Sequence, residues 1–168
     1  MTDAEIDPSI DPAIERLIEE SIEVAAPPER VWELVSDLPR MAEWSPTVTS
    51  MKVYGEEPIG LGTRTSNRNQ DGELVWQTHA EVVRFEPLTE IAFRVEENWV
   101  VWSFTLVPSE AGTTVVQRRA APDGISEFSL ELTEAFMGGV AKYQARLRVG
   151  MRETLERIKS EAEAPPEQ

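Results

Sequence analysis

Cysteine and histidine, two residue types that commonly carry out chemistry, are missing or scarce in this chain, and this excludes several kinds of site. The sequence contains no cysteine and a single histidine, His79. Disulfides, thiolate nucleophiles and Cys-ligated zinc are therefore excluded, and one histidine cannot form a multi-histidine metal site. We predict no bound metal and no cofactor. Much of the chemistry that enzymes carry out with cysteine, metal ions or several histidines is excluded as well.

His79 lies in a stretch that reads as a β-hairpin, because Asp71-Gly72 is typical of a two-residue turn. If Gln70 pairs with Glu73, counting outward predicts which side chains share a face of the sheet. One face pairs Asn69 with Leu74, Asn67 with Trp76, Thr65 with Thr78 and Thr63 with Ala80. The other pairs Arg68 with Val75, Ser66 with Gln77, Arg64 with His79 and Gly62 with Glu81. This second face is water-facing, so His79 is a poor candidate for a general base.

The first face of that hairpin mixes asparagines and threonines with large apolar groups. Asn67 and Asn69 would be unfavourable in a dry core, because a buried amide without a hydrogen-bond partner costs about 1–3 kcal/mol. A hollow that holds water or a ligand would accept them. The pattern therefore predicts a cavity with a partly polar wall.

A second hairpin, with its turn at Glu97-Asn98, presents large apolar side chains on the same side of the sheet. Counting from this turn pairs Val95 with Val100, Phe93 with Trp102 and Ile91 with Phe104. Trp102 could either pack in the core or line a pocket, and the sequence leaves both alternatives open.

Arg118 and Arg119 are adjacent in a strand, so they must point to opposite faces of the sheet. We predict that Arg119 points inward, because the same parity sends Val115 and Gln117 inward and pairs Val115 with Leu106. An inward guanidinium needs a carboxylate, a carbonyl or an oxygen-bearing ligand nearby. Arg119 is therefore the best candidate for a polar anchor.

Strand-length runs separated by Gly, Pro, Asp and Asn fill the middle of the chain, which is typical of a continuous antiparallel meander. Six strands are predicted there, over Val48–Gly55, Gly62–Gln70, Glu73–Phe85, Glu90–Glu96, Trp99–Val107 and Thr113–Ala120. Alternation of apolar and polar residues predicts a further strand over 18–24, with a helix from Asp11 through Glu20 as the alternative. Two short helices are predicted between this strand and Val48, within 27–37 and 39–46.

The hydrophobic period changes to that of a helix near the C-terminus. Apolar residues recur at spacings of three and four, at Val140, Tyr143, Leu147, Met151, Leu155 and Ile158. A helix over 140–161 would be about 33 Å long, enough to cross a whole sheet. Gly138-Gly139 either ends a shorter helix over 127–137 or kinks a single longer one.

Composition predicts a single domain without nucleic-acid or membrane partners. The 168 residues include 31 acidic and 16 basic side chains, a formal charge of −15 that would repel phosphate backbones and anionic lipids. No apolar run approaches the roughly 20 residues that span a bilayer. We expect a cytoplasmic protein, a monomer or weak homodimer, with a flexible segment over 1–15, one domain over 16–163 and a disordered tail over 164–168.

The element order resembles that of the START-like (Bet v 1-like, SRPBCC) superfamily. "SIEVAAPPERVWELVSD" resembles its opening strand and helix, and "NRNQDGELVW", "VVRFEPLTEIAFRV" and "VGMRETLERIKSEAE" resemble its polyketide cyclase/dehydrase and lipid-transport group. The resemblance implies an α+β helix-grip fold, in which a curved seven-stranded antiparallel sheet wraps around a long C-terminal helix. It also implies a cavity between them. Ala80 departs from the cyclases of the superfamily, which place charged groups on this strand.

The main functional hypothesis is a carrier or sensor that binds a hydrophobic small molecule such as a lipid, polyketide or aromatic metabolite. One alternative is a cyclase, aromatase or dehydrase that uses the same cavity, and another is a protein-interaction module of the toxin- or ribosome-associated kind. No catalytic residue is assigned. The predicted cavity residues are Trp44, Thr65, Asn67, Asn69, Trp76, Thr78, Phe93, Trp102, Phe104, Gln117, Arg119, Phe136, Val140, Tyr143 and Leu147.

Overall fold

A computed structural model describes residues 14–165 of the chain. Its sheet has seven antiparallel strands in the order β1-β7-β6-β5-β4-β3-β2. The strands are β1 (Leu17–Val24), β2 (Val48–Val53), β3 (Arg64–Asp71), β4 (Leu74–Glu86), β5 (Glu90–Val95), β6 (Val101–Pro108) and β7 (Thr113–Ala120). The helices are α1 (Pro28–Val35), the short 3₁₀ helix η1 (Leu38–Arg40), α2 (Met41–Trp44), α3 (Glu127–Phe136) and α4 (Val140–Glu163).

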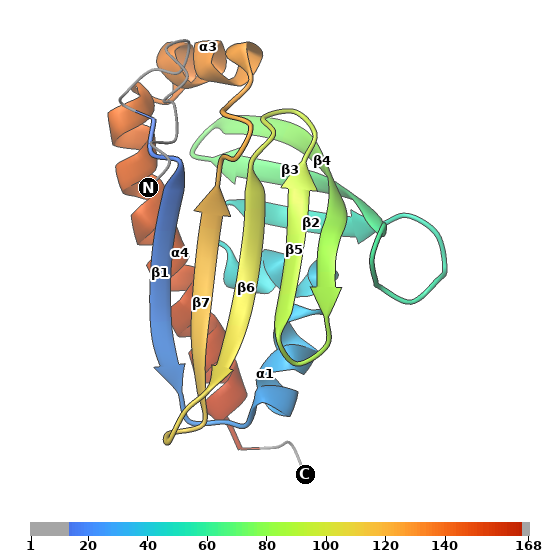
Figure 1. Cartoon of the computed structure of the whole chain (residues 1–168). Helices are drawn as coiled ribbons and strands as arrows, with labels where there is room; N and C mark the ends of the chain where they lie inside the picture. Colours follow the sequence, from blue (N-terminus) through green and yellow to red (C-terminus); the bar gives the residue numbers. More distant parts are fainter. Residues whose placement is uncertain (1–13, 166–168) are drawn as a thin grey trace, which may run out of the picture.

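This architecture confirms the predicted α+β helix-grip fold. Strands β2 to β7 form the expected meander, and β1 pairs with β7 at the other edge of the sheet. Figure 1 shows α4 running along the curved sheet, with α3 across its upper end. The alternative helix through Glu20 is wrong over 17–20, because these residues lie in β1; residues 11–13 lie outside the described residues. Of the two terminal segments predicted to be flexible, the structure describes only 14–15 and 164–165.

The carboxyl half of α4 packs against a solid core, while its amino half does not. Met151, Leu155 and Ile158 are buried on the predicted helical stripe. Leu155 and Ile158 belong to the same hydrophobic cluster as Leu34 of α1. Leu147 and Tyr143, one and two turns before Met151, are only partly buried. The space between sheet and helix is therefore filled at the α1 end and incompletely filled toward α3.

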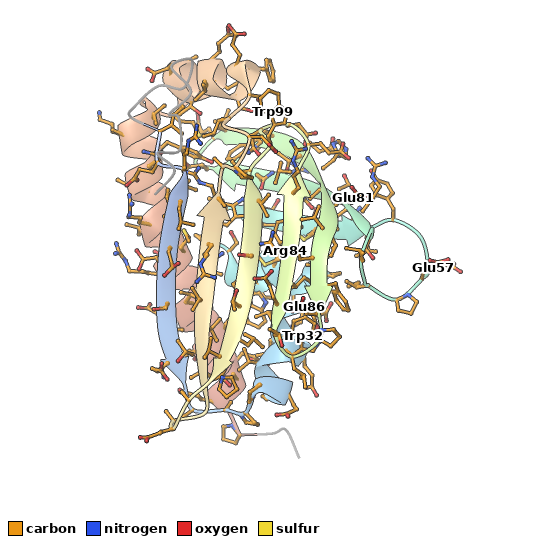
Figure 2. The ribbon with its side chains drawn as sticks, viewed as in Figure 1. Trp32, Glu57, Glu81, Arg84, Glu86 and Trp99 are labelled. Carbon is orange, nitrogen blue, oxygen red and sulfur yellow. The ribbon has the colours of Figure 1, made fainter. Side chains whose placement is uncertain are left out.

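The convex face of the sheet is polar and charged. Arg84 of β4 forms an ion pair with Glu90 of β5 on this outer face, and Figure 2 labels Arg84, Glu81 and Glu86 there. The loop between β2 and β3 projects from the sheet, with Glu57 at its outer edge (Figure 2). None of the helices in the described part of the chain combines the length and the hydropathy that a bilayer-crossing segment needs.

The register of the β3–β4 hairpin differs from the predicted one. Asp71 pairs with Leu74, so the two turn residues are Gly72 and Glu73 rather than Asp71 and Gly72. Gly72 has φ 62°, and a glycine with positive φ at the first central position is typical of a type II′ turn. The actual pairs are Asn69 with Trp76, Asn67 with Thr78, Thr65 with Ala80 and Ser66 with His79.

This shift moves each partner by two positions, and an even shift leaves every side chain on its predicted face. The following hairpins have the predicted register. Phe93 pairs with Trp102, Ile91 with Phe104, and Leu106 with Val115. Arg119 accordingly lies inside and is 2% exposed, which confirms its predicted direction.

Candidate functional site

Two adjoining cavities lie between the concave face of the sheet and the amino half of α4. The first has a volume of about 420 Å³ and extends from the α2–β2 connection to the middle of α4. The second has a volume of about 320 Å³ and lies beneath α3. Their common walls show that they adjoin, and the shared residues are Trp76, Thr78, Asn98, Trp102, Tyr143 and Leu147.

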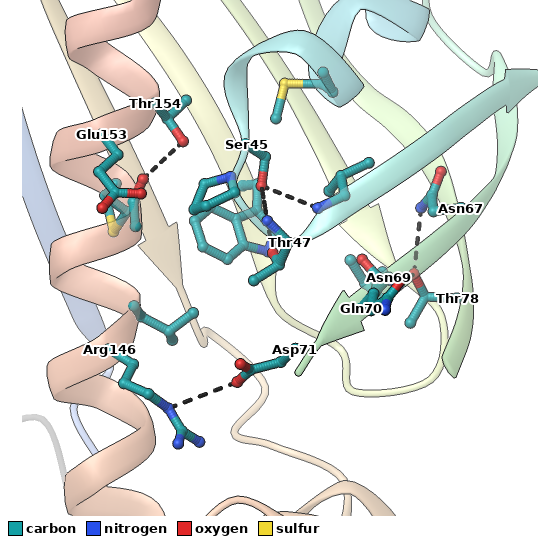
Figure 3. Close-up of a pocket in the computed structure, with 18 of the residues that line it drawn as sticks. Ser45, Thr47, Asn67, Asn69, Gln70, Asp71, Thr78, Arg146, Glu153 and Thr154 are labelled. Carbon is teal, nitrogen blue, oxygen red and sulfur yellow. Dashed lines mark hydrogen bonds and ion pairs between the residues drawn. The ribbon is translucent and has the colours of Figure 1, made fainter. Parts of the chain in front are cut away.

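The first cavity has a polar wall on β3, β4 and β7. The Asn69 side-chain amide donates to the Thr78 hydroxyl at 3.1 Å, and Asn67 donates to the same hydroxyl at 3.4 Å. Figure 3 shows these three side chains together on the sheet. Among the described residues, the buried amide oxygens of Asn67 and Gln117 have no hydrogen-bond partner. The wall therefore retains unused hydrogen-bonding capacity.

The rim of the first cavity joins α4 to the turn between β3 and β4. Arg146 of α4 reaches across to Asp71, with 3.7 Å between its Nε and the carboxylate (Figure 3). The opposite rim is the α2–β2 connection, where the Ser45 hydroxyl accepts hydrogen bonds from the backbone N–H groups of Thr47 and Val48. These contacts fix two edges of the opening in place.

The second cavity is walled mainly by apolar side chains, and α3 covers it without being buried itself. The α3 residues Phe128, Leu132 and Phe136 line this cavity and are also exposed to solvent. At its N-terminus, α3 is held by the hydroxyls of Ser126 and Ser129, which both donate to the Glu97 carbonyl. Helix α3 therefore closes one end of the binding space through few contacts.

Arg119 lies in the wall of the second cavity, next to the boundary with the first. Its Nη1 donates to the Glu15 carbonyl at 3.1 Å and its Nη2 to the Gln144 side-chain oxygen at 3.4 Å. Burial lowers the pKa of the Arg119 guanidinium, although electrostatic interaction with the nearby Tyr143 phenol and with Glu15 opposes this shift. Burial also raises the pKa of the Tyr143 phenol, so that Tyr143 stays protonated at neutral pH.

Most of the side chains predicted to surround a cavity line one of these two. Nine line the first cavity: Asn67, Asn69, Trp76, Thr78, Phe93, Trp102, Gln117, Tyr143 and Leu147. Arg119, Phe136 and Val140 line the second. Trp44, Thr65 and Phe104 line neither cavity and are packed in the interior, at 3%, 2% and 2% exposure. Thr65 and Phe104 share the concave face of the sheet with cavity residues, whereas Trp44 belongs to α2. All three lie nearer the solid end of the fold, where α1 and α2 fill the space.

Several lining residues were not predicted from the sequence. Asp71 and Arg146 at the rim are far apart in the chain, and only the folded hairpin brings them together. Phe128 and Leu132 could have been predicted from the sequence. Together with Phe136 they recur every four residues and form an apolar stripe on α3. That stripe lies among glutamates, which makes it resemble an ordinary solvated helix.

His79 lies on the outer face of the sheet and lines neither cavity. Its Nδ1 is 2.8 Å from a carboxylate oxygen of Glu97. Glu96 is also close, and ligand atoms of the three side chains lie within 4.8 Å of one another. Glu96 already forms an ion pair with Arg64, so each carboxylate has a protein partner.

Comparison with known proteins agrees with this architecture. The di-domain ARO/CYC BexL from the BE-7585A biosynthetic pathway superposes with a TM-score of 0.69 at 20% identity, covering 93% of this chain and 52% of BexL. The chain thus spans about half the length of that protein. The Zhui aromatase/cyclase from Streptomyces sp. R1128 has a TM-score of 0.67 at 21% identity, covering 88% of this chain and 93% of Zhui.

A third structure is more similar in sequence. The Polyketide_cyc-like protein Cgl2372 from Corynebacterium glutamicum is 29% identical, with a TM-score of 0.59, covering 85% of this chain and 88% of Cgl2372. No curated protein sequence is significantly similar to the chain. The family described as polyketide cyclase / dehydrase and lipid transport matches residues 16–163. This chain is therefore a member of that family, within the START-like superfamily.

Proposed function

We propose that this protein binds a mainly apolar small molecule, such as a lipid, a polyketide or an aromatic metabolite, in its two adjoining cavities. The observation that carries the proposal is the pair of internal hollows, of about 420 and 320 Å³, with common walls. Each volume falls within the roughly 300–1,000 Å³ typical of small-molecule sites. The family description, which includes lipid transport, supports the same reading.

Most of the affinity would come from aromatic and aliphatic walls. Trp76, Trp102 and Leu147 border both cavities, so a ligand that occupies either one is in reach of them. Burying apolar ligand surface contributes about 25 cal/mol per Å². The amides of Asn67, Asn69 and Gln117 would orient the ligand by hydrogen bonds, since polar groups in a pocket supply specificity.

The proposal is tested by looking for a bound molecule in the purified protein. Native mass spectrometry should show an added mass, and organic extraction should release an apolar compound. Protein stripped of that compound should then enhance the fluorescence of N-phenylnaphthylamine, an uncharged dye that emits strongly in apolar sites. A stripped protein that leaves the dye emission unchanged would refute ligand binding in these cavities.

A second candidate function is that of a cyclase, aromatase or dehydrase acting in the same cavities. The family description includes polyketide cyclases and dehydrases, and Arg119 and Tyr143 place a cation and a protonated phenol in one cavity wall. Such groups can stabilise an oxyanion or donate a proton to it. Ala80, which is buried on β4, offers no charge from the strand that carries Trp76 and Thr78.

Turnover distinguishes the two candidates. An enzyme of this kind would convert a poly-β-ketone substrate to cyclised product, and Arg119→Ala and Tyr143→Phe would abolish or strongly slow the conversion. A carrier would bind the substrate and release it unchanged. Product analysis after incubation with the wild type and both variants therefore decides between them.

A further inference from the structure

Arg119 is a buried cation that uses only part of its hydrogen-bonding capacity. A guanidinium has five N–H donors. Within the described residues, one acceptor lies near Nη1 and one near Nη2, while the buried Nε has none. The side chain is 2% exposed, so bulk water does not supply the missing acceptors.

The two acceptors that Arg119 does have are neutral. One is the backbone carbonyl of Glu15 and the other is the side-chain amide of Gln144. The Glu15 carboxylate instead binds Arg148 through two hydrogen bonds of 2.6 and 2.7 Å. No carboxylate in the described part of the chain forms an ion pair with Arg119.

A guanidinium stays charged even when its pKa is lowered by burial, because its usual pKa lies far above neutral pH. A buried charge without a counter-charge is costly, and proteins retain one mainly where something offsets it. The protein has an overall charge of −15, but these charges compensate the positive charge of Arg119 only at long range. A counter-anion in contact with Arg119 would remove most of this cost.

The remaining donors of Arg119 adjoin the binding space. Arg119 lines the second cavity together with Tyr143, and Tyr143 also borders the first. The acidic residues of the cavity walls are engaged elsewhere, since Asp71 faces Arg146 and Glu97 binds His79. Glu153 lines only the first cavity, with α4 residues of the outer rim. The wall around Arg119 thus offers donors and a positive charge, with apolar side chains beyond them.

We infer that the ligand of these cavities is an amphiphilic organic acid, whose anionic oxygen is bound by Arg119 and Tyr143 at the boundary between the cavities. Its apolar body occupies the second cavity beneath α3, the first cavity, or both. This inference rests on the proposed function and specifies the chemical class of its ligand. The Tyr143 phenol, held protonated by burial, donates the second hydrogen bond.

The test compares two probes that differ only in their head group. Decanoate and decanol compete against N-phenylnaphthylamine for the stripped wild-type protein, and their apparent Kd values are measured from dye displacement at pH 7.5. We expect decanoate to bind at least tenfold more tightly than decanol, as a charge-assisted hydrogen bond to a buried cation requires. Equal affinities, or a preference for the alcohol, would overturn the inference while leaving apolar binding intact.

Variants locate the preference. Arg119→Met should remove the advantage of decanoate, so that the acid and the alcohol bind with similar affinity, whereas Arg119→Lys should retain part of the advantage. Arg118→Met is the matched control, because Arg118 is the adjacent arginine on the outer face and pairs with Glu19. A decanoate preference that survives in Arg119→Met would contradict the assignment. The wild-type comparison of acid and alcohol decides the matter even if Arg119→Met does not fold.

The failure of the inference and the failure of the proposed function give different results. If the dye itself does not bind to stripped protein, both are refuted. If the dye binds and both competitors displace it equally, only the acidic head group is refuted. Tyr143→Phe is an independent test, since loss of the hydroxyl should weaken the binding of decanoate several-fold more than the binding of decanol.

Discussion

Glu15 and Arg148 are joined by two hydrogen bonds, of 2.6 and 2.7 Å, that tie the segment before β1 to α4. The backbone carbonyl of the same Glu15 accepts from Arg119 in the cavity wall. One residue therefore contacts both a surface arginine and the buried one. Its carboxylate and its carbonyl can be tested separately, because a side-chain substitution changes only the first.

Glu15→Gln should lower the thermal unfolding temperature slightly and leave ligand binding unchanged. The substitution removes the negative charge that pairs with Arg148, and a partly exposed pair of this kind contributes little to stability. The carbonyl that accepts from Arg119 stays in place. Differential scanning calorimetry measures the first effect and dye titration the second. A marked loss of dye affinity in Glu15→Gln would contradict this separation of roles.

The difference between Glu15→Gln and the wild type should depend on pH in a defined direction. Hydrogen bonds from Arg148 lower the pKa of the Glu15 carboxyl in the folded protein. A lowered folded-state pKa gives stability that is present above the unfolded-state pKa and is lost as the pH falls through the folded-state value. The wild type should thus be more stable at pH 7, and the two proteins should converge under acid conditions. Comparing the pair cancels the effect of protonating the other carboxylates.

Asn67→Leu should stabilise the protein and weaken binding of hydroxylated ligands. The Asn67 side-chain oxygen is buried and has no hydrogen-bond partner among residues 14–165, and replacing such a group by an apolar one of similar shape is expected to add about 1 kcal/mol. The Thr78 hydroxyl keeps its shorter hydrogen bond from Asn69, so little else is lost. Asn69→Leu is the contrasting variant and should be destabilising, because it removes that bond. Chemical denaturation measures both free energies of unfolding.

Sequence reasoning predicted the faces of the strands more accurately than their register. Side chains alternate with a period of two, so a shift by two positions between Asn67 and its partner changes the contact but not the side of the sheet. The Asp-Gly signal located the β3–β4 turn, yet whether Gly72 stands first or second in it depends on local backbone conformation. Patterns of residue type do not report φ angles directly.

The depth of the cavity could not be predicted from the same alternation. Thr65, Asn67 and Asn69 lie on one face of one strand, yet only the asparagines border the first cavity. Whether a concave-face residue meets packed side chains or empty space depends on how far α1 and α2 extend along the sheet. The second cavity depends on the placement of α3, which no local pattern specifies.

Gly112→Ala should destabilise the fold strongly. Gly112 has φ 145°, and an added Cβ would lie 2.6 Å from the carbonyl oxygens of Val24 and Ala26. Backbone atoms at that distance must move, so we expect a loss of about 3 kcal/mol or more in the free energy of unfolding. Gly72→Ala is the control. Its φ is 62° but nothing lies near the added Cβ, so only about 1–2 kcal/mol should be lost. Equal losses in urea denaturation would show that the contact with the end of β1 is unimportant.

Trp76→Ala and Trp32→Ala should have opposite profiles, because one tryptophan borders both cavities and the other is partly buried and packs against the hydrophobic core. Trp76 lines the two hollows, so its removal should lower dye affinity about tenfold, the value of one large apolar contact. Trp32 packs edge-on against Phe85 with ring centroids 5.5 Å apart and lines neither cavity. Its loss should cost about 3 kcal/mol in stability, the low end of the range for a core tryptophan, because the side chain is only partly buried.

The comparison is informative because a side chain that borders a void lacks contact atoms on that side, and so contributes less to packing than one that lies against the hydrophobic core. Trp76→Ala should therefore lose less stability than Trp32→Ala while losing far more affinity. Thermal unfolding and dye titration on the same preparations measure the two quantities. If Trp76→Ala unfolded as readily as Trp32→Ala and still bound the dye with wild-type affinity, the hollows beside Trp76 would not be the binding space.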